Sequence, residues 1–370
     1  MLPAQGFFVF FFAVCGFLLL RLLTHWRRPR PAQARPRVSI LLPARNEAHH
    51  IERCLQSLAA LTYPAELLEI LVGDDHSTDD TAAVVRRFIQ DKPQFRLVRI
   101  GAPVGQAKGK SNAIAQLTRQ ASSDYFLLTD ADMALAPDWV EHMLGAAEID
   151  RADSRVGVVT GATTATGGWF GRLQGLDWLF GLSVIRLLTD LRQPVTAVGN
   201  NMLVTRRAYD SIGGYEALAF QITEDLQLFA SVVEAGWDYR NLWYRQVLGV
   251  SMPQPTLRCL LEQRKRWMRG TGRLPWQLSG LFGLYGLFYV VLFFPPLVSW
   301  PLTPLIFGLK LLLQVLFLHV SLRQVGRREP LWLLVLYEPY LALMSLLIIG
   351  YTLWPGHIRW KERRYAWAEV

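Results

Sequence analysis

The stretch Tyr125-Phe-Leu-Leu-Thr-Asp-Ala-Asp-Met133 decides the fold class, because an apolar run ends in two carboxylates one residue apart. Such a run is typical of a buried strand whose carboxyl end opens into a crevice, where α/β sheets bind ligands. In an extended chain residues i and i+2 point to the same side, so Asp130 and Asp132 can face one ligand. Two carboxylates this close repel each other, and a divalent cation with oxygen ligands is the usual partner. The alternative is a surface turn with two solvated acids.

The composition indicates a membrane protein. Of the 370 residues, 51% are hydrophobic, and the formal net charge is +9. Because the basic residues flank the apolar segments, they favour lipid headgroups and an anionic substrate over a nucleic acid polymer as partners. The three cysteines are far apart and form no C-x-x-C pair, so a disulfide framework and a zinc site are not expected.

The first apolar run, Phe7 to Leu23, predicts an N-terminal transmembrane anchor within residues 1–26. Its basic residues follow the apolar run, whereas a signal peptide carries them before it. Since basic loops stay inside, we expect an integral protein of the bacterial inner membrane with the domain that follows the anchor in the cytoplasm. Residues 27–37, rich in Pro and Arg, are expected to form a stiff basic linker.

Residues 38–255 alternate short β-rich runs with amphipathic helical stretches, which is typical of a mostly parallel α/β sheet. Val38 to Pro43 and Glu69 to Gly73 are predicted strands. The second strand also ends in acids, Asp74 and Asp75. Capping of the helix that follows is the alternative role for these two carboxylates.

Three later sites carry groups that suit an anionic ligand. Lys110 begins a predicted helix, where an ammonium can reach a diphosphate, although a solvated lysine is the alternative. Glu224 and Asp225 begin another helix, and there the alternative is an acidic pair that favours the helix dipole. Gln263-Arg-Lys-Arg-Trp267 combines cations with an indole, and alone it would indicate an interfacial helix with snorkelling arginines.

Taken in order, these residues resemble the membrane-bound family 2 glycosyltransferases, inverting enzymes with the Rossmann-like GT-A fold, and the motif set is similar to those of ceramide glucosyltransferases and processive synthases. The resemblance covers roughly residues 38–270. One departure is His76, where small residues such as Gly are common in the family. The matching elements are P-A-R-N-E (43–47), D-D-H-S-T-D (74–79), G-K-S (109–111), D-A-D (130–132), G-N-N-M (199–202), G-G-Y (213–215), T-E-D (223–225) and Q-R-K-R-W (263–267).

The resemblance implies a donor site for a nucleotide sugar. Asp74 and Asp75 would bind the donor, with Asp75 at the nucleobase. Asp130 and Asp132 would hold the ribose and a Mg²⁺ or Mn²⁺ on the diphosphate, with Asp132 as the direct metal ligand. Cations there would stabilise the charge that builds on the leaving group. The donor-binding candidates among the remaining residues are Lys110, Gln263 and Arg266.

The resemblance also implies the acceptor chemistry. Asp225 would be the general base that deprotonates the acceptor hydroxyl, and direct displacement with one base gives inversion. Glu224 would orient neighbouring groups or cap the helix that begins there. Asn200, Asn201 and Trp267 would face the acceptor.

The C-terminal part is predicted to be membrane. Residues 256–280 are expected as an amphipathic interface segment, 281–354 as a membrane region of about three apolar segments broken near Pro295-Pro296 or Pro301, and 355–370 as a basic tail. Three full spans would put this tail outside, against the positive-inside rule, so either one segment is re-entrant or interfacial or the rule fails. Glu338-Pro339 is where we expect a break.

Three functions compete. The first is transfer of a sugar from a UDP-sugar to a hydroxyl of a membrane lipid, and the second is a processive polysaccharide synthase of the poly-N-acetylglucosamine type. The third is a non-enzymatic membrane scaffold, which has no use for carboxylates at three loops beside a cationic, aromatic motif. The scarcity of ionisable residues in the apolar segments favours lateral access of a lipid over passage of a sugar chain, although a homodimer could build a pore.

Overall fold

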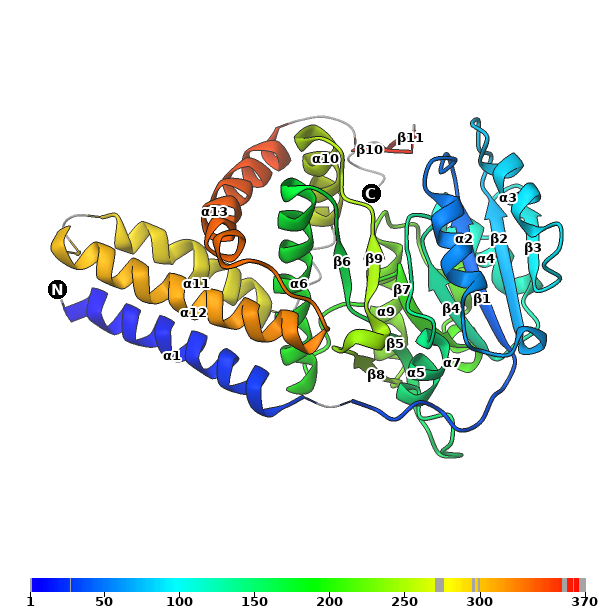
Figure 1. The fold of residues 1–370 in the computed structure, drawn as a ribbon, viewed down its shortest axis with the longest axis horizontal. Coiled ribbons are helices and arrows are strands. Elements are labelled where there is room, and N and C mark those ends of the chain that lie inside the picture. Colours follow the sequence, from blue (N-terminus) through cyan, green and yellow to red (C-terminus); the bar gives the residue numbers. More distant parts are fainter. Residues whose placement is uncertain are drawn as a thin grey trace.

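A seven-stranded sheet forms the centre of the polar domain (Figure 1). The computed structural model describes residues 2–26, 28–269, 276–294, 297–298, 300–354, 358–361 and 363–365. The strand order is β3-β2-β1-β4-β7-β5-β8. The strands are β1 (Val38–Ala44), β2 (Leu68–Asp74), β3 (Phe95–Arg99), β4 (Tyr125–Thr129), β5 (Val156–Thr160), β7 (Asn201–Thr205) and β8 (Asp238–Asn241).

The sheet is mostly parallel, as predicted. Strands β3, β2, β1 and β4 lie side by side in this order and are parallel. Strand β5 pairs in parallel with β8, and β7 runs antiparallel to both β4 and β5. Ala44 of β1 lies opposite Asp74 of β2, and Leu41 lies opposite Leu128 of β4. The carboxyl ends of β1, β2 and β4 therefore meet at one edge, which brings the acids that follow them together.

Helices cover both faces of the sheet because its buried strands are apolar on both sides. Ile40 and Leu42 of β1 belong to one core and Leu41 to the other. Each such side chain contributes about 1.5–3 kcal/mol on burial. The first core includes helices α2 (Ile51–Ala59), α3 (Thr81–Ile89) and α5 (Trp139–Ala146), and the second includes α4 (Lys110–Gln120), α7 (Arg206–Ser211), α8 (Gly214–Ala217) and α9 (Glu224–Glu234).

Two helices, α6 (Trp169–Asp190) and α10 (Leu257–Met268), lie between the sheet and the apolar helices (Figure 1). Leu173 and Leu176 of α6 share one core with Leu318 and Leu322 of an apolar helix, so α6 joins the two parts of the protein. A two-stranded sheet of β6 (Thr163–Ala165) and β9 (Gly249–Ser251) lies beside α6.

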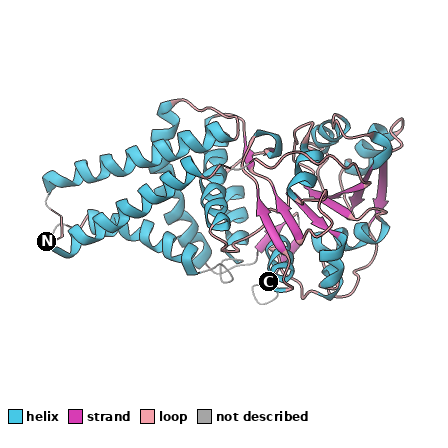
Figure 2. Cartoon of the chain, turned by 90° about the horizontal axis from the view of Figure 1, so that it is seen from below, coloured by secondary structure: helices cyan, strands magenta, loops and turns pink. Residues whose placement is uncertain are grey.

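The apolar helices lie together on one side of the sheet (Figure 2). Three of them, α1 (Leu2–Thr24), α11 (Trp276–Leu292) and α12 (Thr303–Gln324), form a bundle that extends away from the sheet, whereas α13 (Leu331–Leu353) packs against α12, α6 and α10. Among the residues that the structure describes, three stretches are long and apolar enough to cross a membrane, Ala4–Thr24, Trp300–Gln324 and Leu331–Leu353, and α11 is shorter. Large apolar side chains are exposed on all four helices, as expected for surfaces that face lipid.

Helix α13 differs from our expectation in one respect. The predicted break at Glu338-Pro339 is wrong, because α13 is continuous with Pro339 inside it. The buried carboxylate of Glu338 instead has protein around it, as a charge at this depth requires: it contacts Lys310 and Tyr289, and accepts a hydrogen bond from Tyr285 at 3.1 Å.

Both ends of α13 lie against the polar part of the protein. Just before its first turn, Glu329 pairs with Arg172 of α6. At its end, the carbonyl of Trp354 accepts a hydrogen bond from Lys265 of α10 at 2.7 Å. Figure 1 shows α13 curving back beside α10 rather than following α12 to the far end of the bundle.

The described part of the basic tail, residues 358–361 and 363–365, contacts the polar domain through Lys361 and Arg363. Strands β10 (Ile358–Trp360) and β11 (Arg363–Tyr365) form an antiparallel hairpin. The predicted break near Pro295-Pro296 lies outside the described residues, whereas Pro301 is in a short 3₁₀ helix (Trp300–Leu302). Helix α11 begins inside the segment predicted as interfacial, and the domain boundaries stay predictions.

Candidate active site

One cavity of about 1610 Å³ runs from the carboxyl edge of the sheet into the apolar helices. At the sheet it is lined by strand-end acids, and farther on by apolar side chains of α11 and α13 such as Phe282, Val290, Leu341 and Ile349. Of the residues singled out from the sequence, those that line it are Asp75, Lys110, Asp130, Asp132, Asn200, Glu224, Asp225, Gln263, Arg266 and Trp267.

Lys110 links two of the predicted acidic sites. It is the first residue of α4, and its Nζ lies 2.6 Å from Oδ1 of Asp130 and 3.0 Å from Oε1 of Glu224. Burial opposes its charge, but Asp130, Glu224 and Asp225 outweigh this and hold the pKa of Lys110 above its ordinary value. The alternative of a solvated lysine is therefore wrong, and a fixed cation lies among the carboxylates.

Asp132 is held by residues from distant parts of the chain. Its Oδ2 accepts a hydrogen bond from Ser251 Oγ at 2.6 Å, and its backbone carbonyl accepts one from Arg53 at 3.1 Å. The same guanidinium donates a hydrogen bond to the Val250 carbonyl at 3.0 Å, which ties the loop of Asp132 to strand β9. Burial, and then the neighbouring charge of Asp130, raise the pKa of Asp132 to about 6.

Asp130 and Asp132 fit a divalent cation bound with help from a substrate. Their oxygens are the hard ligands that Mg²⁺ and Mn²⁺ prefer, and a cation would relieve the repulsion that raises the pKa of Asp132. Among the described residues, no group of three or more His, Cys, Asp or Glu side chains could hold a metal. Such a site would thus be completed by phosphate oxygens, as magnesium sites often are.

Asp225 begins α9 beside Glu224 and is fixed by backbone groups. Its Oδ2 accepts a hydrogen bond from the N–H of Gly199 and its Oδ1 one from the N–H of Leu226, both at 2.9 Å. Glu224 is buried, and burial raises its pKa although Lys110 acts in the opposite direction. The two acids thus differ. Asp225 is held by backbone groups at the cavity, whereas Glu224 is the buried partner of Lys110.

The two acids after β2 have different surroundings. Asp74 accepts a hydrogen bond from the N–H of Ser77 at 3.1 Å and closes the loop, outside the cavity lining. Asp75 lines the cavity and is nearly buried. Between them and the next helix, His76 has φ 58°, a left-handed conformation in which glycine is unstrained. This conformation gives a physical reason why small residues are common at that position in the family that the sequence resembles.

The Q-R-K-R-W segment lies on α10 and contributes Gln263, Arg266 and Trp267 to the cavity. The indole of Trp267 meets that of Trp178 edge to face, with ring centroids 4.7 Å apart. Arg264 lies over the same ring at 4.3 Å and pairs with Asp177 of α6 at 2.6 Å. These contacts fix Trp267 as one wall of the cavity between its polar and apolar parts.

Asn200 and Asn201 are separated by the fold. Asn200 lines the cavity, and its Oδ1 accepts a hydrogen bond from Thr163 at 2.9 Å. Asn201 is completely buried; its amide donates to the carbonyls of Ala162 and Val247 and accepts from the indole of Trp139. These three hydrogen bonds occupy the side-chain amide of Asn201 inside the core, so this side chain does not face the sugar acceptor as we expected.

Sequence analysis missed several residues of the cavity. Ser251 had no local signal, because it reaches Asp132 from a strand 119 residues away. Arg45 and Glu47 stood in the P-A-R-N-E motif without a role and both line the cavity. Lys361 of the basic tail also lines the cavity, and Arg363 of the same tail binds Asp75, although the tail had no expected place in the site.

The sequence profile of Glycosyl transferase family 21 matches residues 6–369. The chain belongs to this family. The expected GT-A fold is confirmed by a solved structure, the mannosyltransferase PcManGT from Pyrobaculum calidifontis in complex with GDP-Man and Mn²⁺. It superposes with a TM-score of 0.54 at 20% identity over 94% of each chain.

Curated relatives of this family 21 chain include both lipid and polymer enzymes by name. A beta-monoglucosyldiacylglycerol synthase from Synechocystis sp. is 30% identical over 250 residues, 64% of this chain and 48% of its own length. A poly-beta-1,6-N-acetyl-D-glucosamine synthase from Staphylococcus aureus is 28% identical over 236 residues, 63% of this chain and 54% of its own length. The chain thus spans about half the length of the curated relatives it matches.

Proposed function

We propose that the protein transfers a sugar from a nucleotide-diphosphate donor, a UDP-sugar, to a hydroxyl of a membrane lipid with inversion at the anomeric carbon. One observation carries this proposal: a single cavity joins the strand-end carboxylates to apolar side chains of α11 and α13. A water-soluble donor could therefore bind at the polar end of the cavity while a lipid acceptor binds at its apolar end, with the two reacting groups close together.

The donor would lie over the carboxyl edge of the sheet. Asp75 would contact the nucleobase, and Asp130 and Asp132 would hold a divalent cation on the diphosphate, which would neutralise charge on the leaving group. Lys110 keeps its own charge inside the cavity and would stabilise the same charge at the β-phosphate. That PcManGT is described with GDP-Man and Mn²⁺ supports a metal-bound nucleotide at this edge.

Asp225 is our candidate for the general base. Two backbone N–H groups hold its carboxylate in position at the cavity, where it could accept the proton of an acceptor hydroxyl. One base that removes the acceptor proton during displacement gives inversion without a covalent intermediate. Glu224, bound to Lys110, would position that ammonium rather than take part in proton transfer.

The acceptor would occupy the part of the cavity between α6, α11 and α13. Its described lining there is dominated by Leu, Ile, Val and Phe, which suits lipid chains, and Trp267 stands between this part and the carboxylates. The name of the Synechocystis relative agrees with a lipid acceptor. The staphylococcal relative keeps a polysaccharide synthase as the second candidate.

The contacts of α13 suggest a membrane topology. Because both of its ends contact the polar part, we infer that α13 does not cross the membrane, whereas α1, α11 and α12 do. The basic tail then lies on the same side as the catalytic domain, in agreement with the positive-inside rule. This is the re-entrant or interfacial alternative that the sequence left open, with the domain in the cytoplasm.

Purified protein in detergent, incubated with a panel of radiolabelled UDP-sugars and a bacterial lipid extract, tests the proposal. Label that partitions into organic solvent supports a lipid product. Label retained in a high-molecular-weight, glycosidase-sensitive fraction would replace it with the polysaccharide synthase, and turnover of no donor would reject the enzyme class. An Asp225→Asn preparation serves as the control for contaminating activity.

A further inference from the structure

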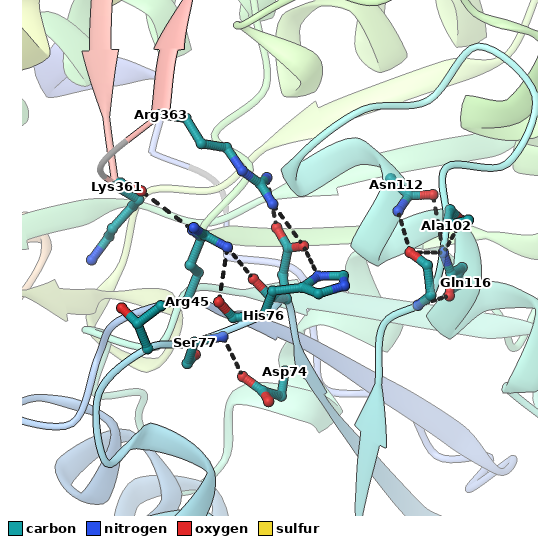
Figure 3. A network of polar contacts seen from close by, with 12 residues as sticks. Arg45, Asp74, His76, Ser77, Ala102, Asn112, Gln116, Lys361 and Arg363 are labelled. Atoms are coloured by element: carbon teal, nitrogen blue, oxygen red, sulfur yellow. Dashed lines mark hydrogen bonds and ion pairs between the residues drawn. The ribbon is translucent and has the colours of Figure 1, made fainter.

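The C-terminal hairpin β10–β11 reaches the loop that carries Asp75 (Figure 3). Arg363 binds Asp75 with both ends of its guanidinium, Nη1 at 2.8 Å from Oδ2 and Nη2 at 3.0 Å from Oδ1. Parallel double hydrogen bonds of this kind are among the stronger and more directional polar contacts in proteins. The Asp75 side chain is 7% exposed, so its carboxylate is largely shielded from water, whereas Arg363 is 29% exposed.

A second set of contacts holds the turn of the hairpin. Lys361 Nζ lies 2.5 Å from Oε1 of Glu47, and the Lys361 carbonyl accepts a hydrogen bond from Arg45 at 3.2 Å. Arg45 also donates to the carbonyls of Asp75 at 2.6 Å and His76 at 3.0 Å. One arginine therefore connects the hairpin to the loop after β2, as Figure 3 shows.

These contacts lie at the donor end of the cavity. Lys361, Glu47, Arg45 and Asp75 line the same cavity as Asp132. A nucleoside diphosphate here carries two to three negative charges, and the hairpin brings two cations to it. Arg363 uses both oxygens of Asp75, and His76 lies 3.3 Å from one of them, so a nucleobase must compete for this carboxylate.

We propose that the β10–β11 hairpin is a lid of the donor pocket, latched by Arg363 on Asp75 until a nucleoside diphosphate takes over that carboxylate. The released Arg363 and the neighbouring Lys361 then face the diphosphate and hold it. The inference rests on the proposed function, because it assigns the nucleotide to this end of the cavity. It adds two donor-binding residues from a segment more than 280 positions from Asp75 along the chain.

The test measures binding of UDP with Mn²⁺ to the purified full-length chain by titration calorimetry. We expect Lys361→Ala with Arg363→Ala to weaken UDP binding by roughly tenfold or more, since charged hydrogen bonds are lost. The variant Arg363→Lys should bind UDP more tightly than this double variant, because lysine keeps the positive charge but cannot donate two parallel hydrogen bonds. In turnover assays the donor KM should rise while the acceptor KM stays unchanged.

Arg151→Ala is the matched control, because this arginine pairs with acids at the protein surface, and its UDP affinity should equal that of the unaltered protein. If the double variant binds UDP as tightly as the unaltered protein or more tightly, with an unchanged melting temperature, the proposed lid is wrong. Tighter binding would show that the hairpin blocks the donor pocket. If the unaltered protein binds no UDP, GDP or ADP, the proposed function fails and the lid with it.

Discussion

The backbone N–H of Gly199 donates a hydrogen bond to Oδ2 of Asp225 at 2.9 Å, and this approach requires glycine. A Cβ at position 199 would lie 2.7 Å from the Cβ of Asp225, closer than side chains pack. The backbone of the loop before β7 is thus in direct contact with a side chain at the start of α9. The position of the proposed base therefore depends on a residue that has no side chain.

Replacement of Asp225 by Asn tests its role as base. The amide keeps the shape but cannot accept the proton, so kcat should fall by about 10²-fold or more while the donor KM changes little. Steady-state assays with varied donor and acceptor give both values. Turnover equal to that of the unaltered protein would remove Asp225 from the mechanism.

Gly199→Ala should displace Asp225 without changing its chemistry. The added methyl group must push the carboxylate away or shift the loop, at a cost of about 1–3 kcal/mol that appears in kcat, in stability or in both. Gly280→Ala on α11 is the control, because a Cβ there meets nothing within 4 Å. Equal rates for the two variants would show that the Gly199 contact does not position the base.

Removal of the proposed metal ligand, Asp132, should abolish turnover. Asp132→Ala takes away a carboxylate that would bind the cation on the diphosphate, so UDP affinity should lose its dependence on Mn²⁺ or Mg²⁺. Calorimetry with and without the metal measures this directly. Full activity of the unaltered protein in excess chelator would exclude a metal in the reaction.

The buried Lys310–Glu338 pair should matter for stability rather than chemistry. Each side chain is 2% exposed, and together they join α12 to α13. Lys310→Met leaves the carboxylate buried without its cation and should cost about 3–5 kcal/mol, seen as a lower melting temperature in detergent. Lys310→Met with Glu338→Leu removes both charges and should recover most of the loss. A single variant as stable as the unaltered protein would contradict this role.

The residues that could be predicted from sequence are those whose position follows from local structure. Asp75, Asp130 and Asp132 directly follow strands β2 and β4, and parallel strands bring such ends to one edge. Lys110 and Asp225 begin helices, which the local pattern also indicates. In each case the strand or helix that places the side chain is formed by the residues next to it.

The residues that could not be predicted depend on contacts between distant segments. Asn201 looks like its neighbour Asn200, but the alternation of β7 turns its side chain into the core. Hydropathy cannot distinguish a helix that crosses the membrane from one whose two ends lie on the same side. Only the contacts of Glu329 and Trp354 show that both ends of α13 lie against the polar part of the protein. Similarly, no local pattern in a basic tail indicates that Arg363 reaches Asp75.

The central claim is that the apolar half of the cavity holds the lipid acceptor, and two glycines of α11 allow a matched test. Gly286 lines the cavity and Gly283 does not, and a Cβ at either meets nothing within 4 Å. The measurement is the amount of glycosylated lipid formed per molecule of UDP-sugar hydrolysed by Gly286→Trp and by Gly283→Trp. This ratio should fall roughly tenfold for Gly286→Trp, with UDP binding unchanged, because an indole would occupy the space of the acceptor. It should not change for Gly283→Trp, and equal ratios for the two variants would contradict a lipid acceptor in this part of the cavity.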